Sequence, residues 1–212
     1  MTAVGKLDPS STIFFVCDIQ TRFRHAIHAF EDVVATANKM VKVAKILGIP
    51  VVTTVQNSKG MLPITPLGPT VPEINLEALG DLHLGTIDKT LFSMLTPEVK
   101  TILQEHHIKD VVLFGIESHV CVLQSTLDLL SERYVVHVIA DGVSSCNKEE
   151  VPFALARMRQ AGAQITTSES AAFQLQRDSS HSTFKEFAAM IKEGKDTTKR
   201  VLESLLPVKP NL

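Results

Sequence analysis

Three side chains that could together carry out covalent catalysis, Asp18, Lys89 and Cys121, each lie at or just beyond the end of an apolar stretch. A cysteine thiolate can attack a carbonyl carbon, and an aspartate within reach can accept the thiol proton as a general base. A lysine beside them would balance their negative charges. These residue types therefore indicate a thiol nucleophile, provided that the fold brings the three positions together.

The stretch from Val111 to Leu130 predicts how the chain presents Cys121. An apolar run ends at Gly115, and Ser118 then fits the N-cap of a helix. Beyond it, apolar residues recur at the helical spacing of three and four, at Val120, Leu123, Leu127 and Leu130. Cys121 then lies in the first helical turn, where free backbone N–H groups and the helix dipole favour a thiolate. A buried, inert cysteine fits this stretch equally well.

The rest of the chain alternates between strand and helix patterns. Strands are expected at 12–17, 50–55, 86–88, 111–114, 135–140 and 163–166. Helices are expected at 24–47, 72–79, 96–107, 118–130, 147–162, from 168, at 183–192, and in the amphipathic tail after Gly194. Gln56 to Leu84 holds four prolines and is interpreted as a long loop, which in a compact domain is usually functional.

Several residues mark expected helix ends. Thr96 is a predicted N-cap followed by Pro97 at the first helical position. Gly48 is expected to end the helix at 24–47. Asn147 and Glu150 resemble a capping box, and Ser168 is the predicted cap of the helix that follows.

This alternation predicts an α/β fold, a doubly wound parallel sheet within a single domain spanning residues 1–212. Ligands of such sheets bind beyond the carboxyl ends of the strands. Asp18, Lys89 and Cys121 are all expected at that edge, where a buried strand rarely ends in a charge that lacks a partner.

Composition limits the possible functions. The net charge is −2, with no Trp and one Tyr, which argues against a nucleic-acid partner. The three cysteines show no paired spacing, which is typical of free thiols in a reducing compartment. No apolar stretch reaches membrane-spanning length and no leader pattern occurs, so we expect a cytoplasmic protein without a membrane partner.

The segments FFVCDIQTRF, IDKTLFS and GIESHVCVLQSTLDLL resemble the isochorismatase-like cysteine hydrolases, and the resemblance covers about residues 10–190. It implies a Rossmann-like three-layer sandwich around a six-stranded parallel sheet, with a helical tail at about 195–212. It also implies a catalytic triad of Asp18, Lys89 and Cys121, and a homo-oligomer that acts on a small molecule.

The resemblance further implies a cis peptide bond between Ile116 and Glu117. The backbone N–H groups of Glu117 and Cys121 would then form the oxyanion hole. Phe23, Gln56 and Phe92 flank the triad positions and, together with Ile116, are the predicted substrate-binding residues, although each could equally serve packing.

Two departures from relatives narrow the predicted chemistry. Nicotinamidases carry an Asp-x-His metal motif after the second strand, where this chain has Gln56, Asn57 and Ser58. True isochorismatases have glycine in place of the nucleophile, whereas Cys121 is present here. We therefore expect hydrolysis of a small amide or a related C–N or ester bond, with no metal and no cofactor.

Rival interpretations remain open. Cys146 also follows a strand and is a second candidate nucleophile. His119 lies two residues from Cys121 and would suggest a Cys–His dyad, although residues two apart on a helix do not face each other. Cys17 lies within a strand and fits the core. His25 and His28 could share a helix face, but no further ligand spacing accompanies them. The alternative function is that of a binding or assembly protein whose triad is slow or idle.

Overall fold

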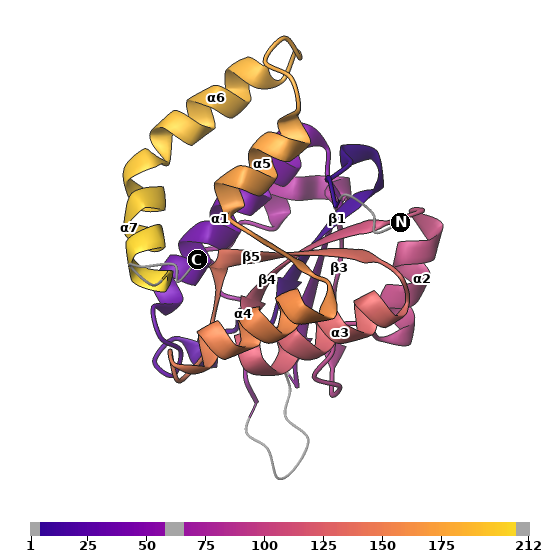
Figure 1. The fold of residues 1–212 in the computed structure, drawn as a ribbon, viewed down its shortest axis with the longest axis vertical. Helices are drawn as coiled ribbons and strands as arrows, with labels where there is room; N and C mark the ends of the chain where they lie inside the picture. The colour runs from indigo at the N-terminus through magenta and orange to yellow at the C-terminus, as the bar shows by residue number, and fades with distance from the viewer. Residues whose placement is uncertain (1–4, 58–65, 207–212) are drawn as a thin grey trace.

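The computed structural model describes residues 5–57 and 66–206. Its centre is a six-stranded sheet in the order β3-β2-β1-β4-β5-β6, in which every neighbouring pair is parallel (Figure 1). The strands are β1 (Thr12–Cys17), β2 (Val51–Gln56), β3 (His83–Lys89), β4 (Asp110–Ile116), β5 (Val135–Ser144) and β6 (Gln164–Thr166).

Helices cover both faces of this sheet and enclose two apolar cores. One face packs against α1 (Phe30–Leu47), α5 (Ser168–Gln176), α6 (Phe184–Glu193) and α7 (Lys195–Leu205). The other packs against α2 (Pro97–Glu105), α3 (Leu123–Ser131) and α4 (Glu150–Ala161). The continuous apolar runs of β1 and β4 are buried at every residue because both of their faces are covered. The predicted α/β fold with a six-stranded parallel sheet is confirmed.

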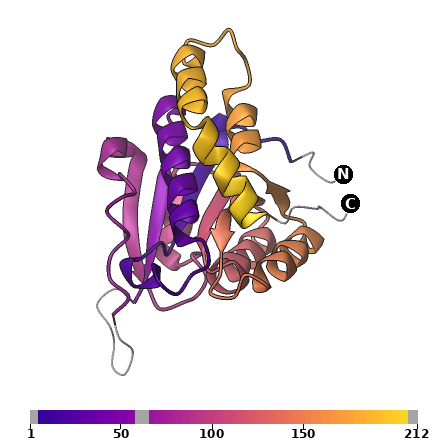
Figure 2. The ribbon, with the colours of Figure 1, turned by 90° about the vertical axis from the view of Figure 1, so that its left-hand side faces the viewer.

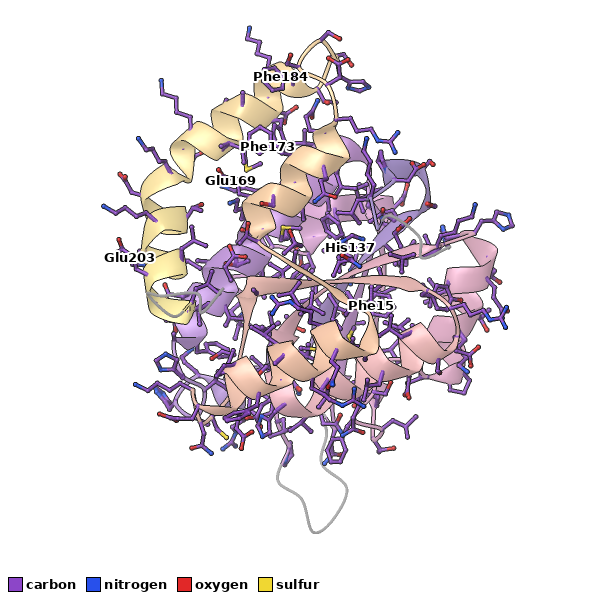
Figure 3. All side chains as sticks on the ribbon, in the orientation of Figure 1. Phe15, His137, Glu169, Phe173, Phe184 and Glu203 are labelled. Carbon is purple, nitrogen blue, oxygen red and sulfur yellow. The ribbon has the colours of Figure 1, made fainter. Side chains whose placement is uncertain are left out.

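The last two helices form an outer layer over α1 and α5 (Figures 1 and 2). The apolar side chains of α7, Val201 and Leu205, are buried in the α1-side core. On the neighbouring helices, the rings of Phe173 and Phe187 meet edge to face at 5.0 Å, and Figure 3 shows Phe173 on α5 beside α6. Within residues 5–57 and 66–206, no helix combines the length and apolarity needed to span a bilayer.

The order of the strands reverses between β1 and β4, and the two strands approach closely there. Gly115 has a φ of +126°, and a Cβ at this position would lie 2.1 Å from the carbonyl oxygen of Cys17. Glycine is required at this point because no side chain fits. The residues that follow β1 and β4 are thereby held side by side, at the kind of switch point where such sheets bind ligands.

Several predicted boundaries were wrong. The helix expected from Arg24 begins at Phe30, because Ala29 has a left-handed φ of 49° and the backbone of His28 is bound to Ser144 and Ser145. The strand expected at 86–88 extends over His83–Lys89, and the one expected to end at Ala140 continues to Ser144.

Some of the predicted helix caps are confirmed and others were wrong. Thr96 caps α2 with Pro97 in the first turn, and Gly48 ends α1 in the left-handed region, both as predicted. The predicted caps Ser118 and Ser168 were wrong, because their hydroxyls bind Ser145 and Asp141 instead. The capping box at Asn147 was also wrong, since α4 begins at Glu150 without a side-chain cap.

The long segment after β2 is described from residue 66 onward, and the rest of the predicted loop, 58–65, lies outside the described residues. The helix expected at 72–79 is instead a 3-10 turn, η3 (Glu77–Leu82). Before it, the backbone around Pro69 to Val71 hydrogen-bonds to Ile19 and Thr21, just beyond β1. This segment therefore lies next to Asp18.

One core residue makes stability depend on pH. His137 of β5 lies in the middle of the molecule (Figure 3), is 1% exposed, and neither ring nitrogen has a hydrogen-bond partner in the described part of the chain. Burial lowers the pKa of His137 to about 4. As pH falls below about 6.5, the imidazole becomes protonated in the unfolded chain but stays largely neutral in the folded chain. By pH 4 this difference lowers the free energy of unfolding by about 3 kcal/mol.

We therefore expect His137→Leu to reduce the loss of unfolding free energy that occurs when the pH is lowered. Urea unfolding at about pH 7 and about pH 4.5 should show a loss in wild type that exceeds the loss in the variant by about 2–3 kcal/mol. The same substitution at exposed His25 is the matched control and should leave the pH difference unchanged. Equal losses in wild type and His137→Leu would contradict this assignment.

Candidate active site

A buried ion pair lies at the carboxyl edge of the sheet. The Nζ atom of Lys89, the last residue of β3, is 2.7 Å from Oδ2 of Asp18, the first residue after β1. The two side chains are 0% and 1% exposed. The strands that carry them are separated in the sheet by β2, and both reach the same edge because all three run parallel. The predicted pairing of Asp18 with Lys89 is confirmed.

Asp18 is held from several sides. It has a left-handed φ of 49°, a conformation that aspartate tolerates better than most residues. Its Oδ1 accepts a hydrogen bond of 2.7 Å from the Thr54 hydroxyl, and its Oδ2 accepts one of 3.7 Å from the Cys17 thiol in addition to Lys89. These donors stabilise a buried carboxylate.

The Lys89 ammonium is equally enclosed. Besides Asp18, it donates to Oε1 of Gln56 at 2.6 Å and to the carbonyls of Leu91 and Phe92 at 3.1 and 3.0 Å. Four acceptors surround three N–H donors, so the buried cation is fully satisfied. Burial by itself lowers the pKa of Lys89, but the nearby Asp18, Cys17 and Cys121 outweigh it and raise the pKa above its ordinary value. The lysine is therefore a fixed positive charge.

Cys121 lies near this pair, close enough to act on the pKa of Lys89 and of the neighbouring Cys17. It belongs to a short π-helical turn, η4 (Ser118–Val122), that leads into α3, and it is 7% exposed. Burial, followed by a hydrogen bond with Cys121 and the charge of Asp18, raises the pKa of the Cys17 thiol well above its ordinary value. Cys17, the last residue of β1, is thus a neutral thiol next to Cys121.

The turn between β4 and η4 contains a cis peptide bond between Ile116 and Glu117, as predicted. Glu117 occupies the N-cap position of η4, and its carbonyl accepts the backbone N–H groups of Val120 and Val122. The N–H groups of Glu117 and Cys121 stay the predicted oxyanion donors.

The predicted substrate-binding residues divide into two groups. The side chain of Gln56 contacts Lys89, and Phe92, a residue that is 52% exposed, accepts a hydrogen bond from Lys89 through its backbone carbonyl. Phe23, in the short helix η2 (Thr21–Phe23), packs against the α1-side core, and Ile116 is fully buried in that core. Substrate contact through Gln56 and Phe92 stays a prediction, and the placement of Phe23 and Ile116 favours packing.

Three positioning residues were not found from the sequence. Thr54 binds Asp18 from the strand position paired with Cys17, so the parallel register could have indicated it. Gln20, which is fully buried, donates to the carbonyls of Gln56 and Gly68 and thereby joins the ends of β1 and β2 to the following loop. Ser145 binds both Ser118 and His119, and no local pattern indicates this contact.

The rival nucleophile Cys146 has a less favourable environment. It is exposed, and a hydrogen bond with Glu117, followed by burial and the charge of that carboxylate, raises the pKa of its thiol. His119 binds Ser145 through Nδ1. A cavity of about 250 Å³ lies elsewhere, between α1, α5, α6 and α7, and Asp18, Lys89 and Cys121 do not line it.

Comparison with known proteins agrees with this fold. A profile of the isochorismatase domain matches residues 12–170. Isochorismatase domain-containing protein 2 of Xenopus laevis is 45% identical over 191 residues, which cover 90% of this chain and 88% of the relative.

Solved structures are similar as well. MAR1 ribonuclease from Caenorhabditis elegans is 37% identical with a TM-score of 0.83, and the match covers 98% of this chain and 100% of that one. The Escherichia coli YcaC gene product, an octameric hydrolase of unknown specificity, shares the fold at 22% identity and a TM-score of 0.81, over 96% of this chain and 98% of that one. From its sequence and its fold, the chain belongs to the isochorismatase family.

Proposed function

We propose that this protein is a metal-independent cysteine hydrolase that acts on a small amide or a related C–N or ester bond. The observation that carries the proposal is the buried pair of Asp18 and Lys89 beside the Cys121 thiol. Desolvating two charges costs several kcal/mol, so such a pair is poor evidence of stability. Placed next to a thiol at a ligand-binding edge, it supplies a base and a charge for catalysis.

In the first half of the reaction, Asp18 takes the proton of the Cys121 thiol as sulfur attacks the carbonyl carbon. The carbonyl electron pair moves to oxygen, and the N–H groups of Glu117 and Cys121 stabilise the resulting oxyanion. As the intermediate collapses, Asp18 returns the proton to the departing amine and a thioester to Cys121 remains. Lys89 keeps its proton throughout and balances the negative charge.

In the second half, Asp18 takes a proton from a water molecule that attacks the thioester carbon. The C–S bond breaks, the acid is released, and Asp18 returns the proton to the Cys121 sulfur. The net reaction consumes one water for each amide or ester cleaved, and the same base serves both halves. It needs no redox partner, because no atom changes oxidation state.

The experiment that tests the proposal is a screen of small amides, ureas and esters, with Cys121→Ala as the matched blank. An RNA oligonucleotide belongs in the panel because the Caenorhabditis elegans neighbour is a ribonuclease. With a net charge of −2 we expect no RNA cleavage. Turnover of a small acyl compound by wild type alone supports the proposal, and an inert panel together with unreactive Cys121 favours the binding alternative.

Turnover should not require a metal. Residues 56–65, QNSKGMLPIT, contain no His, Cys or carboxylate in the place where metal-dependent relatives carry ligands. We expect a chelator such as EDTA to leave the rate within about twofold of the untreated enzyme, because Lys89 supplies the cation. Loss of activity on chelation that zinc or iron restores would contradict this prediction.

We also expect a homo-oligomer, as the fold neighbour YcaC forms an octamer. The amphipathic tail offers a surface for this contact, but its apolar side chains Val201 and Leu205 are buried within this chain, which disfavours α7 as the interface. Phe153, Leu91 and Phe92 are more suitable, being 75%, 55% and 52% exposed. Light scattering at micromolar protein should give a molar mass that is a multiple of 23.2 kDa. If α4 forms the contact, Phe153→Asp should reduce this mass. A monomer mass for wild type would rule out the oligomer.

A further inference from the structure

A second cluster of reactive side chains lies next to the proposed triad and takes no part in its chemistry. Glu117, His119 and Cys146 each offer one ligand atom, and the three atoms lie within 4.8 Å of one another. Glu117 and His119 come from the turn after β4, and Cys146 from the segment after β5. The two segments meet because β4 and β5 pair in parallel up to Ile116 and Ser144.

The polar partners of these side chains orient them toward one another. The Nδ1 atom of His119 lies 2.9 Å from the Ser145 hydroxyl, which also contacts Ser118, and this arrangement leaves Nε2 free of that contact. One carboxylate oxygen of Glu117, Oε2, accepts the backbone N–H of Cys146 at 2.8 Å, so that the other can turn toward a ligand. Hydrogen bonds of this kind fix the ring orientation and carboxylate direction of metal ligands.

The cluster is also accessible, unlike the other two thiols. Cys146 is exposed, and Glu117 and His119 are partly exposed, whereas Cys17 and Cys121 are both buried. An ion from solvent can therefore reach the Cys146 sulfur without opening the triad.

We propose that Glu117, His119 and Cys146 form a binding site for a zinc-class divalent cation, with a fourth coordination position open to solvent. A thiolate, an imidazole and a carboxylate are together the donor set that Zn²⁺ prefers over Mg²⁺ or Ca²⁺. Bond lengths of about 2.0–2.3 Å and tetrahedral angles place ligand atoms roughly 3.3–3.6 Å apart. The side chains need to close in by about 1 Å, which the exposed Cys146 can do by rotating about χ1.

This site is separate from the chemistry proposed for Cys121. It uses the side chain of Glu117, whereas the proposed oxyanion hole uses the backbone N–H of that residue. Metal binding and hydrolysis can therefore succeed or fail independently, and the proposal holds whether or not the triad is active.

Titration with Co²⁺ tests the site without an activity assay. Co²⁺ in a tetrahedral site with a thiolate ligand gives a sulfur-to-cobalt charge-transfer band in the near ultraviolet and visible d–d bands. The full-length protein, kept reduced with a phosphine that does not chelate, should show these bands with one Co²⁺ bound per chain. Added Zn²⁺ should abolish them, and the same concentration of Mg²⁺ should not.

Variants then assign the ligands. Cys146→Ser should abolish the charge-transfer band, and His119→Ala should weaken Co²⁺ binding by at least about tenfold. Cys121→Ala is the matched control and should keep both the band and the affinity. Circular dichroism of each metal-free variant checks that the fold is intact.

Two results would overturn the proposal. The first is a band that survives in Cys146→Ser and disappears in Cys121→Ala, which would place the cation on the proposed nucleophile. The second is the absence of any charge-transfer band in wild type at millimolar Co²⁺, which would make the cluster an ordinary hydrogen-bonded surface.

Discussion

Turnover of an amide found in the screen is expected to fall by about 10⁴-fold or more when Cys121 is replaced by alanine, because covalent catalysis ends with the loss of the sulfur. The fold should survive, since the change removes only one sulfur atom from the core that the sheet forms with α2, α3 and α4. The measurement is kcat/KM for wild type and variant, together with urea unfolding curves that verify comparable stability.

Cys146→Ala is the matched control for this experiment. It removes a thiol that is exposed and has its pKa raised by Glu117, and we expect kcat/KM to change by less than about twofold. If Cys121→Ala kept its turnover while Cys146→Ala did not, the nucleophile would be Cys146 and the proposed triad would be wrong.

Lys89→Met should have the second large effect, on stability as well as on turnover. Methionine has a similar length but no charge, so the buried Asp18 carboxylate loses its counter-ion. Removing one member of a buried pair costs about 3–5 kcal/mol, since the remaining charge stays desolvated. Urea unfolding near neutral pH measures this cost, and turnover should also be abolished because the charge balance of the triad is lost.

A double variant separates stability from catalysis. Asp18→Asn combined with Lys89→Met leaves no buried charge and should recover most of the lost unfolding free energy, while turnover stays absent. If Lys89→Met alone lowered the free energy of unfolding by less than about 1 kcal/mol, the ion pair would be solvated and its description as buried would be wrong.

The convergence of Asp18 with Lys89 could be predicted because it depends on topology rather than on contacts. Apolar runs that end in a charge, repeated between helical patterns, define parallel strands, and parallel strands carry their last residues to one edge. The same reasoning from topology does not predict the role of Gln20. This side chain binds the backbone carbonyls of Gln56 and Gly68, and its position follows no periodic pattern.

The errors have a common physical origin. Ser118 and Ser168 are good N-caps by local rules, but their hydroxyls are taken by Ser145 and Asp141, which lie 27 residues away in the chain. Local propensities cannot register such partners. In the same way, nothing in the sequence pattern around His137 distinguishes a buried neutral imidazole from an exposed one, because its burial depends on the helices that cover the sheet.

The comparative reactivity of the three thiols tests the central claim most directly. Wild-type protein treated with limiting iodoacetamide near neutral pH can be digested, and the alkylation rate of each cysteine measured by mass spectrometry. Cys121 should react fastest although it is only 7% exposed, with the exposed Cys146 slower and the fully buried Cys17 slowest. If the rates instead follow exposure alone, with Cys146 first and Cys121 as inert as Cys17, Cys121 is not an activated nucleophile and the hydrolase proposal is wrong.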